Sequence, residues 1–333
     1  LVLTTIALAT SVSLAQAQQP YPKRDVPDPG VIATGQRVTP AGVQTVFEGK
    51  IGGVRFGRTS DEIWAAVPGY VYRVDWRGNT LRARIKLDGR PGVYALAVDP
   101  ATHGVLASSV GRLRSPATAA PRAPQVAQVS AFDADAAGDS AVARFNSGAL
   151  GDYMAGAPAI AARAGVGGKR LAVVPLPAND ALAVLDAASG APLRTIQLGV
   201  EPIAAVISAD SRVAYVSILG GSKPTAGQRA SMQCCDPRAE AVRVDARGIG
   251  EAGSVSRVDL VTGSVTRDIA VGRHPTALAW DEVGGRLYVA AGNSDSVTII
   301  DTKADVVAGH IPIAPFRERK AGLAPTALTL SPN

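Results

Sequence analysis

The stretch GRHPTALAWDEVGGRLYVAAGNSDSVTIID, residues 272–301, decides the fold class. It contains short apolar runs that are rich in β-branched and aromatic residues, and turns of Gly, Asp and Asn separate these runs. Runs of this length and composition predict β-strands. The motif Pro-Thr-Ala-Leu that opens the stretch returns in APTALTLSPN, residues 324–333, so the chain contains a repeat.

Four earlier segments align with this stretch, beginning near Gly52, Gly92, Ala157 and Glu201. Each segment holds four short apolar runs, and without its insertions a unit spans about 40–50 residues, which is the period of a propeller blade. One four-stranded sheet cannot cover both of its faces, whereas a ring of sheets buries them against each other. We therefore expect an all-β fold, a β-propeller of four-stranded antiparallel blades A to D, with five blades and the first strand of a sixth out of a ring of seven.

The N-terminus has the pattern of an export signal. An apolar run over residues 1–15 precedes Ala15-Gln16-Ala17, which resembles a cleavage site, and the run is too short and too weakly apolar to span a membrane. We expect a signal peptide remnant at 1–17, an extended segment at 18–42 and a propeller at 43–333 that is incomplete at the C-terminus. Residues 43–49 are predicted to complete the last blade. The predicted location is periplasmic or secreted, with no membrane span.

Composition fits a globular chain and disfavours nucleic-acid binding. Hydrophobic residues make up 47% of the sequence and aromatic residues 5%, so the core must rest on Ala, Val, Leu and Ile. The net charge of +6 comes from scattered basic residues. A nucleic-acid site needs a continuous basic stripe with aromatic side chains for stacking, and the sequence offers neither.

An aspartate recurs where the third strand of each blade ends, at Asp75, Asp133, Asp186, Asp259 and Asp301. A carboxylate in this position accepts backbone N–H bonds of the following turn. The aspartates follow the repeat and do not gather at one place, so we interpret them as turn caps and not as acidic ligands.

Four long connections are predicted to lie on the same side of the ring. In an antiparallel blade the A–B and C–D loops lie on one face and the B–C and D–A loops on the other. Residues 111–125 and 222–252 are B–C insertions, and residues 149–156 and 314–322 are D–A connections. Long loops on one side of a rigid scaffold mark a binding surface. We call this side, with the B–C and D–A loops, the insertion face.

Polar residues of these loops near the ring axis are the candidate ligand-binding residues. Ordinary turn chemistry is the alternative role for each of them. They are Arg273, His274, Glu201, Asn179, Asp180, Asn293 and Asp295.

The sequence predicts no catalytic residue, no metal site and no cofactor. The histidines, His103, His274 and His310, lie in different blades without a partner at short spacing, which disfavours zinc. Cys234 and Cys235 are the only cysteines and are adjacent. They are a candidate for a strained disulfide in an oxidising compartment, and two free thiols are the alternative.

The segment PTALAWDEVGGRLYVAAGNSDSVTIIDT, residues 275–302, resembles the repeat of YncE-like seven-bladed propellers. The segments VPDPGVIATGQRVTPAGVQTVFEGKIGGVRFG, residues 26–57, and IPIAPFRERKAGLAPTALTLSP, residues 311–332, resemble bacterial exported proteins in which such a propeller precedes an alkaline-phosphatase-like phosphoesterase domain. In that family the metal ligands and the nucleophile belong to the phosphoesterase domain. None of those positions occurs here, so the resemblance assigns no catalytic residue.

We therefore expect an exported propeller that acts as a binding or interaction module. Its partner is an unknown small molecule or protein on the insertion face, and the resemblance implies a downstream domain of the same protein. The alternative is a propeller enzyme, lactonase-like or an oxidoreductase, with its site in the axial funnel. That site needs histidines and carboxylates from several blades, and His274 with Glu201 and Asp295 is the only start that the sequence offers. A nucleic-acid-binding propeller is the third hypothesis.

Overall fold

The computed structural model describes residues 23–24, 45–78, 80–112, 124–165, 167–232, 240–251, 253–313 and 323–331. The chain divides into two compact units, residues 1–48 and residues 49–333. In the first unit, β1 (Lys23–Arg24) pairs antiparallel with β2 (Thr45–Val46). This pairing involves part of residues 43–49, and their proposed role in completing a last blade stays a prediction.

Five antiparallel sheets follow one another along the second unit, and in each sheet the strands pair in chain order. Blade one contains β3 (Gly53–Phe56), β4 (Glu62–Val67), β5 (Tyr70–Asp75) and β6 (Thr80–Lys86). Blade two contains β7 (Arg90–Val98), β8 (Val105–Arg112), β9 (Gln125–Phe132) and β10 (Phe145–Asn146). Blade three contains β12 (Ala159–Ile160), β13 (Leu171–Leu176), β14 (Ala181–Asp186) and β15 (Pro192–Gln197). Blade four contains β16 (Val200–Ile207), β17 (Val213–Gly221), β20 (Gly253–Asp259) and β21 (Ser264–Val271). Blade five contains β22 (Pro275–Asp281), β23 (Arg286–Ala291), β24 (Ser296–Asp301) and β25 (Val306–Pro312).

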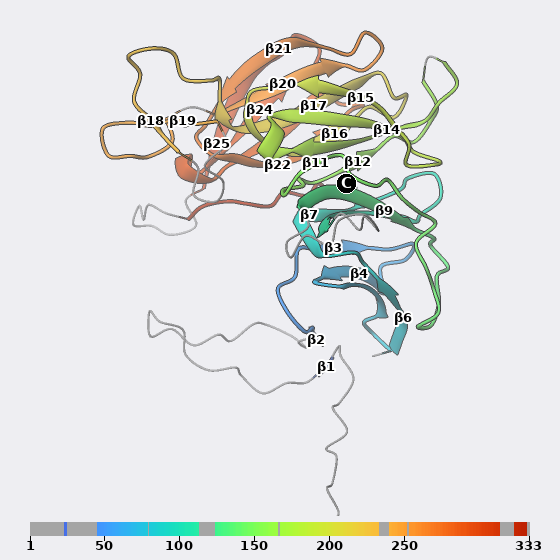
Figure 1. The fold of residues 1–333 in the computed structure, drawn as a ribbon. Helices are drawn as coiled ribbons and strands as arrows, with labels where there is room; N and C mark the ends of the chain where they lie inside the picture. The colour runs from blue at the N-terminus through green and yellow to red at the C-terminus, as the bar shows by residue number, and fades with distance from the viewer. Residues whose placement is uncertain are drawn as a thin grey trace, which may run out of the picture. The chain divides into compact units, whose positions relative to one another are not determined.

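The sheets are the blades of a β-propeller, as the repeat predicts. In Figure 1 they follow one another from the blue β3, β4 and β6 to the orange β20, β21 and β25. The first strands of successive blades lie side by side: Ala95 N donates to Gly52 O at 2.9 Å, and Ala157 N donates to Ile203 O at 2.8 Å. These bonds join the blades around a common axis.

The hydrophobic core lies between successive blades, where facing sheets bury their apolar side chains against each other. Trp64 and Ile85 of blade one pack with Leu96 and Phe132 of blade two, and similar clusters join blades two with three, three with four and four with five. Apart from a few aromatic side chains these clusters consist of Ala, Val, Leu and Ile. Burial of one such aliphatic side chain larger than Ala contributes about 1.5–3 kcal/mol.

A buried ion pair also joins two blades. Arg170 at the start of β13 holds Asp99, which follows β7, through two hydrogen bonds, one of them 2.7 Å long from Nη2 to Oδ2. The Asp99 side chain is 3% exposed. Burial alone raises the pKa of Asp99, but the bonds from Arg170 and from Ala101 N–H outweigh it, so the pKa lies below its ordinary value.

Four of the five predicted turn caps are confirmed. Asp75, Asp186, Asp259 and Asp301 each end the third strand of a blade and accept backbone N–H bonds of 2.8–3.3 Å from the next turn. The prediction is wrong for Asp133. Its carboxylate makes no such bond to a described residue and lies 3.8 Å from Arg144 Nε instead.

Two strand assignments differ from the sequence prediction. Gly151–Asp152 forms β11, which pairs with β9, so residues 149–156 are not entirely a connection but extend the outer edge of blade two. Residues 323–331 were expected to be the first strand of a sixth blade. They contain no assigned strand, because no second strand among the described residues supplies a ladder of hydrogen bonds.

Candidate functional site

The B–C and D–A loops do share one face. The insertion of residues 222–252 leaves β17 and returns to β20, and it carries the hairpin β18 (Ala230–Ser231) and β19 (Val242–Arg243). Its Lys223 lies 3.8 Å from Asp180 in the B–C loop of blade three, and its Asp245 lies 3.7 Å from Arg273 in the D–A loop that precedes blade five. The insertion therefore lies along this face beside two of the predicted groups of residues.

Asp180 and Asp295 hold blades to each other. Each follows a one-turn 3-10 helix, η1 (Pro177–Asn179) or η2 (Gly292–Ser294), and adopts a left-handed φ of 50° or 47°. Asp180 Oδ1 accepts Glu201 N–H at 2.9 Å, and Asp295 Oδ1 accepts Leu323 N–H and Ala324 N–H at 2.8 and 2.9 Å. In both blades the aspartate after the 3-10 helix thus bonds the chain that begins the next repeat. This gives Asp180 and Asp295 a structural role.

Glu201 and Asp180 form the core of a charged cluster. Burial raises the pKa of Glu201 to about 7, and the nearby Asp180 carboxylate adds to this. Burial also raises the pKa of Asp180, although the hydrogen bond from Glu201 N–H and the charge of Lys223 both act to lower it. Lys223 Nζ lies 2.8 Å from Glu240. The cluster therefore holds three carboxyl groups and one ammonium group at the edge of the insertion.

Asn179 fastens the connection between blades two and three. Its Oδ1 accepts Asp152 N–H at 2.8 Å, and its Nδ2 donates to Asp152 Oδ2 at 2.8 Å. The backbone at Gly151 approaches the Asn179 side chain closely and favours glycine there, because a Cβ on residue 151 would lie 2.3 Å from Asn179 Oδ1. These contacts fix the chain just before Tyr153 and Met154.

The remaining candidates surround η2. Arg273 N–H donates to Ser294 Oγ at 2.8 Å, and Asn293 N–H donates to Arg273 O at 3.2 Å. His274 has a φ of 56°, and burial lowers the pKa of its imidazole. Thus Asn179, Asp180 and Glu201 lie together between blades three and four, while Arg273, His274, Asn293 and Asp295 form a second group beside blade five.

A cavity of about 760 Å³ opens elsewhere on the same face, between blades one and two and the connection that leads to blade three. None of the seven candidates lines it. Its wall comes from the chain before and at the start of β3, the start of β7, the end of β8 and the connection that follows β11. The charged, aromatic and thioether residues in this lining are Lys50, Arg90, Tyr94, Tyr153 and Met154.

The sequence indicated only part of this cavity. Tyr153 and Met154 belong to residues 149–156, which their length marked as a long D–A connection. Lys50, Arg90 and Tyr94 were missed. Tyr94 owes its position to an irregularity in β7, where residues 92–95 lie opposite Ser108 alone, and its φ is 51°. Such a bulge changes the direction in which a side chain points, but no pattern in the sequence predicts it.

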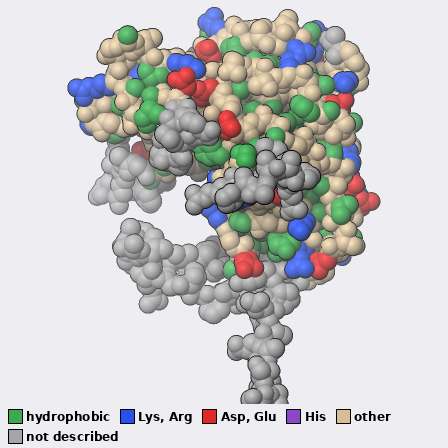
Figure 2. Space-filling view, viewed as in Figure 1, with side chains coloured by type: hydrophobic (Ala, Val, Ile, Leu, Met, Phe, Trp, Pro, Cys, Tyr) green, Lys and Arg blue, Asp and Glu red, His purple; other side chains and the backbone are tan. Residues whose placement is uncertain are grey.

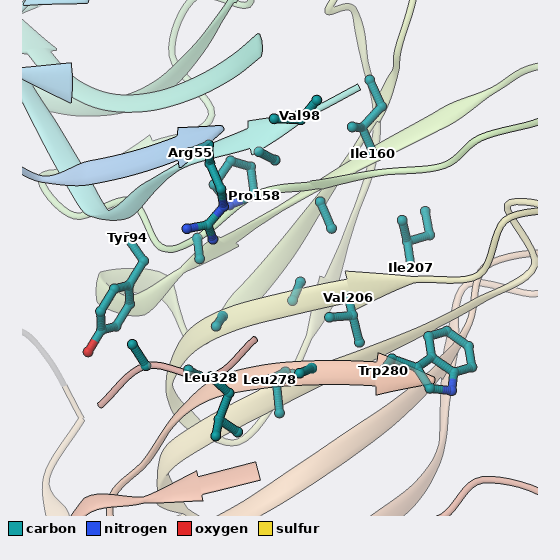
Figure 3. Close-up of a pocket in the computed structure, with 18 of the residues that line it drawn as sticks. Arg55, Tyr94, Val98, Pro158, Ile160, Val206, Ile207, Leu278, Trp280 and Leu328 are labelled. Atoms are coloured by element: carbon teal, nitrogen blue, oxygen red, sulfur yellow. The ribbon is translucent and has the colours of Figure 1, made fainter. Parts of the chain in front are cut away.

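A second cavity, of about 370 Å³, follows the ring axis and is lined by the first strands of the blades and by Ala327 and Leu328. Figure 3 shows Arg55 reaching into it from β3, with Tyr94 on the neighbouring β7, across from Val206, Leu278 and Leu328. Most of the side chains that line it are apolar. Glu282 contributes one carboxylate, whose Oε2 accepts Ala209 N–H at 2.9 Å.

A metal site needs a suitable arrangement of histidines, carboxylates or cysteines. In the part of the chain that the structure describes, no three His, Cys, Asp or Glu side chains gather in a way that could hold a metal ion. His310 Nδ1 lies 3.2 Å from Thr298 Oγ1 within blade five. Cys234 and Cys235 lie outside the described residues.

The charged side chains are dispersed over the surface, as expected from the scattered basic residues of the sequence. On the face that Figure 2 shows, basic and acidic side chains alternate over the described surface without a continuous basic stripe. Within the described ranges, no helix has the length and apolar character needed to cross a membrane.

Comparison with known proteins supports the fold. No family model matches the chain, and no curated protein matches it. Among solved structures, hydrazine synthase of Kuenenia stuttgartiensis is similar with a TM-score of 0.56 and 14% sequence identity, over 88% of this chain and 80% of that one. Identity at this level shows a shared fold alone, and it agrees with the β-propeller described above.

Proposed function

We propose that this chain is a binding module that presents its insertion face to a small molecule or a protein. One observation carries the proposal: the insertion of residues 222–252 and a cavity of about 760 Å³ occupy the same face of the propeller. Concave sites built on loops of a rigid scaffold are the usual location of ligands.

The finer proposal is an exported, YncE-like propeller that forms the N-terminal part of a larger protein with a phosphoesterase domain. Its support is the signal-like pattern of residues 1–17 and the resemblance of residues 26–57, 275–302 and 311–332. The similarity to hydrazine synthase concerns the fold only, so we propose no synthase activity.

The axial cavity does not favour an enzyme. A hydrolytic or redox site in the funnel needs several converging polar groups. The described lining brings Arg55, Tyr94 and Glu282 into the cavity, and Glu282 already accepts a backbone N–H. His274, Glu201 and Asp295, the three residues on which the enzyme hypothesis depended, do not line it.

A ligand screen with paired variants tests the binding proposal. A library of fragments and short peptides is screened by ligand-observed NMR against the wild-type chain. Hits are repeated with Arg273→Ala/Tyr153→Ala on the insertion face and with Arg212→Ala/Val283→Ala in the A–B turns of the opposite face. The second pair removes one cation and one hydrophobic side chain, as the first pair does, and therefore serves as its control.

We expect hits that weaken with the first pair of substitutions and are unchanged by the second. Hits that weaken only with the second pair would place binding on the opposite face and end the proposal. New product signals growing in the same NMR samples would instead identify an enzyme.

A further inference from the structure

The cavity between blade one, blade two and the connection to blade three is a preformed compartment. Val93 N–H donates to Ala155 O at 2.9 Å, and Ala95 N–H donates to Gly52 O at 2.9 Å, so its three main wall segments are joined by backbone bonds. The backbones meet at Gly92, where a Cβ would lie 2.5 Å from Ala155 O. Asn179 holds the third segment through Asp152. A ligand therefore meets walls that need little ordering on binding.

The volume suits a small organic molecule and not a macromolecular segment. Ligand pockets commonly enclose about 300–1,000 Å³, and this cavity has about 760 Å³. Aliphatic side chains, prolines and the thioether of Met154 make most of its wall, and the rings of Tyr94 and Tyr153 add two aromatic surfaces. Aromatic rings and a thioether pack favourably against a flat ring.

The charges of the lining all have one sign. Lys50 and Arg90 are the ionisable groups of the lining besides the tyrosines, and no carboxylate occurs among its described residues. Neither cation forms an ion pair with a described residue, and both are exposed. An arginine beside apolar surface is suited to bind a carboxylate through two parallel hydrogen bonds.

We propose that this cavity binds a small aromatic carboxylate, with its ring between Tyr94, Tyr153 and Met154 and its anionic group at Lys50 and Arg90. The proposal rests on the proposed function, because it names the ligand class of the same face. The backbone of Tyr94 supports it independently. A left-handed φ of 51° is costly for a bulky residue, and strained positions of this kind occur preferentially at binding sites.

The test measures the affinity of 2-naphthoate and of its neutral analogue 2-naphthamide by titration calorimetry at low ionic strength. The variants are Lys50→Gln/Arg90→Gln and, as a control that removes one exposed cation outside the cavity, Lys86→Gln on the outer strand β6. Both cations of the site are exposed, so their loss should leave the thermal unfolding midpoint unchanged. Decanoate, an aliphatic carboxylate, distinguishes a ring site from a site for fatty chains.

We expect the wild-type chain to bind 2-naphthoate at least about 10-fold more tightly than 2-naphthamide, which corresponds to about 1.4 kcal/mol. The double variant should lose this preference, while Lys86→Gln keeps it. Equal affinity for acid and amide, or a preference that survives in the double variant, overturns the assignment. Tighter binding of decanoate than of 2-naphthoate overturns the assignment of the cavity to an aromatic ligand. If fragments bind elsewhere on the insertion face while 2-naphthoate does not bind, this inference fails and the proposed function stands.

Discussion

Asp180 accepts the backbone N–H of Glu201 at 2.9 Å, and this bond ties the first strand of blade four to blade three. Asp295 repeats the arrangement with Ala324 at the other end of the described repeat. Two residues that the sequence presents as candidate ligands thus hold neighbouring blades together. Their place beside the ring axis results from this structural task.

Replacing Asp295 with alanine should destabilise the chain. Two backbone N–H groups lose a charged acceptor, and because Leu323 is half-buried and Ala324 is exposed, each lost hydrogen bond costs about 1 kcal/mol. Urea unfolding should show a loss of about 2 kcal/mol, the sum of the two bonds. Asp281→Ala, which removes a carboxylate from an exposed turn of the same blade, is the control and should cost less than about 1 kcal/mol. Equal losses would mean that the contact between Asp295 and residues 323–324 contributes nothing.

Glu201 should make stability depend on pH. Its pKa is raised to about 7 in the folded chain, against roughly 4.3 in the unfolded chain, so the folded state retains a proton that the unfolded state has lost. The stabilisation is complete below about pH 4 and is lost as the pH rises through 7, by at most about 4 kcal/mol. Asp180, Lys223 and Glu240 are the charged groups of this cluster.

Urea unfolding of the wild-type chain and of Glu201→Gln at about pH 5 and pH 8 measures this effect. We expect the wild-type chain to lose stability relative to the variant between the two pH values. A difference between the two proteins that is the same at both pH values would show that Glu201 titrates as an ordinary exposed carboxyl group.

The ion pair between Arg170 and Asp99 should contribute far more to stability than the ion pair of the adjacent Lys169 with Asp186. Arg170→Met leaves the carboxylate of Asp99 buried without its partner, at a cost of about 3–5 kcal/mol. Lys169→Met removes an exposed lysine that lies 3.4 Å from Asp186, and should cost less than about 1 kcal/mol. Thermal unfolding of the two variants gives the comparison. Similar midpoints would argue that the bond between blades two and three is solvated.

Gly151→Ala should loosen the wall of the cavity. The new Cβ would lie 2.3 Å from Asn179 Oδ1, so either the Asn179 side chain or the chain at residue 151 must move, and both movements disturb the bonds that hold Asp152. We expect weaker binding of 2-naphthoate, by about 10-fold, as for other small displacements in a binding site. Gly250→Ala is the matched control, since nothing lies within 4 Å of its Cβ. Unchanged binding in Gly151→Ala would remove this wall from the site.

The sequence predicted the fold better than the site. Blades repeat, so each strand and each turn cap such as Asp186 or Asp301 appears several times in the same setting, and agreement among copies reveals the pattern. The cavity occurs once. Its residues come from blades one and two and from the connection to blade three, and Tyr94 lines it because of extra residues in β7 that no turn motif or charge pattern marks.

The candidates named from the sequence are polar loop residues. A polar side chain in such a loop can either bond backbone groups of the fold or bind a ligand. Asn179, Asp180 and Asp295 are polar because backbone N–H groups at the blade junctions need acceptors. Arg90 and Lys50 looked like ordinary solvent-exposed charges. Only the fold shows that these two cations share one apolar compartment without a carboxylate.

Hydrogen–deuterium exchange with and without 2-naphthoate is the most direct test of the central claim, that ligands bind on the insertion face. The account predicts slower exchange in residues 90–95 and 151–155, where backbone amides line or support the cavity. Slower exchange in the opposite A–B turns, such as residues 281–286, with none at the cavity, would contradict it.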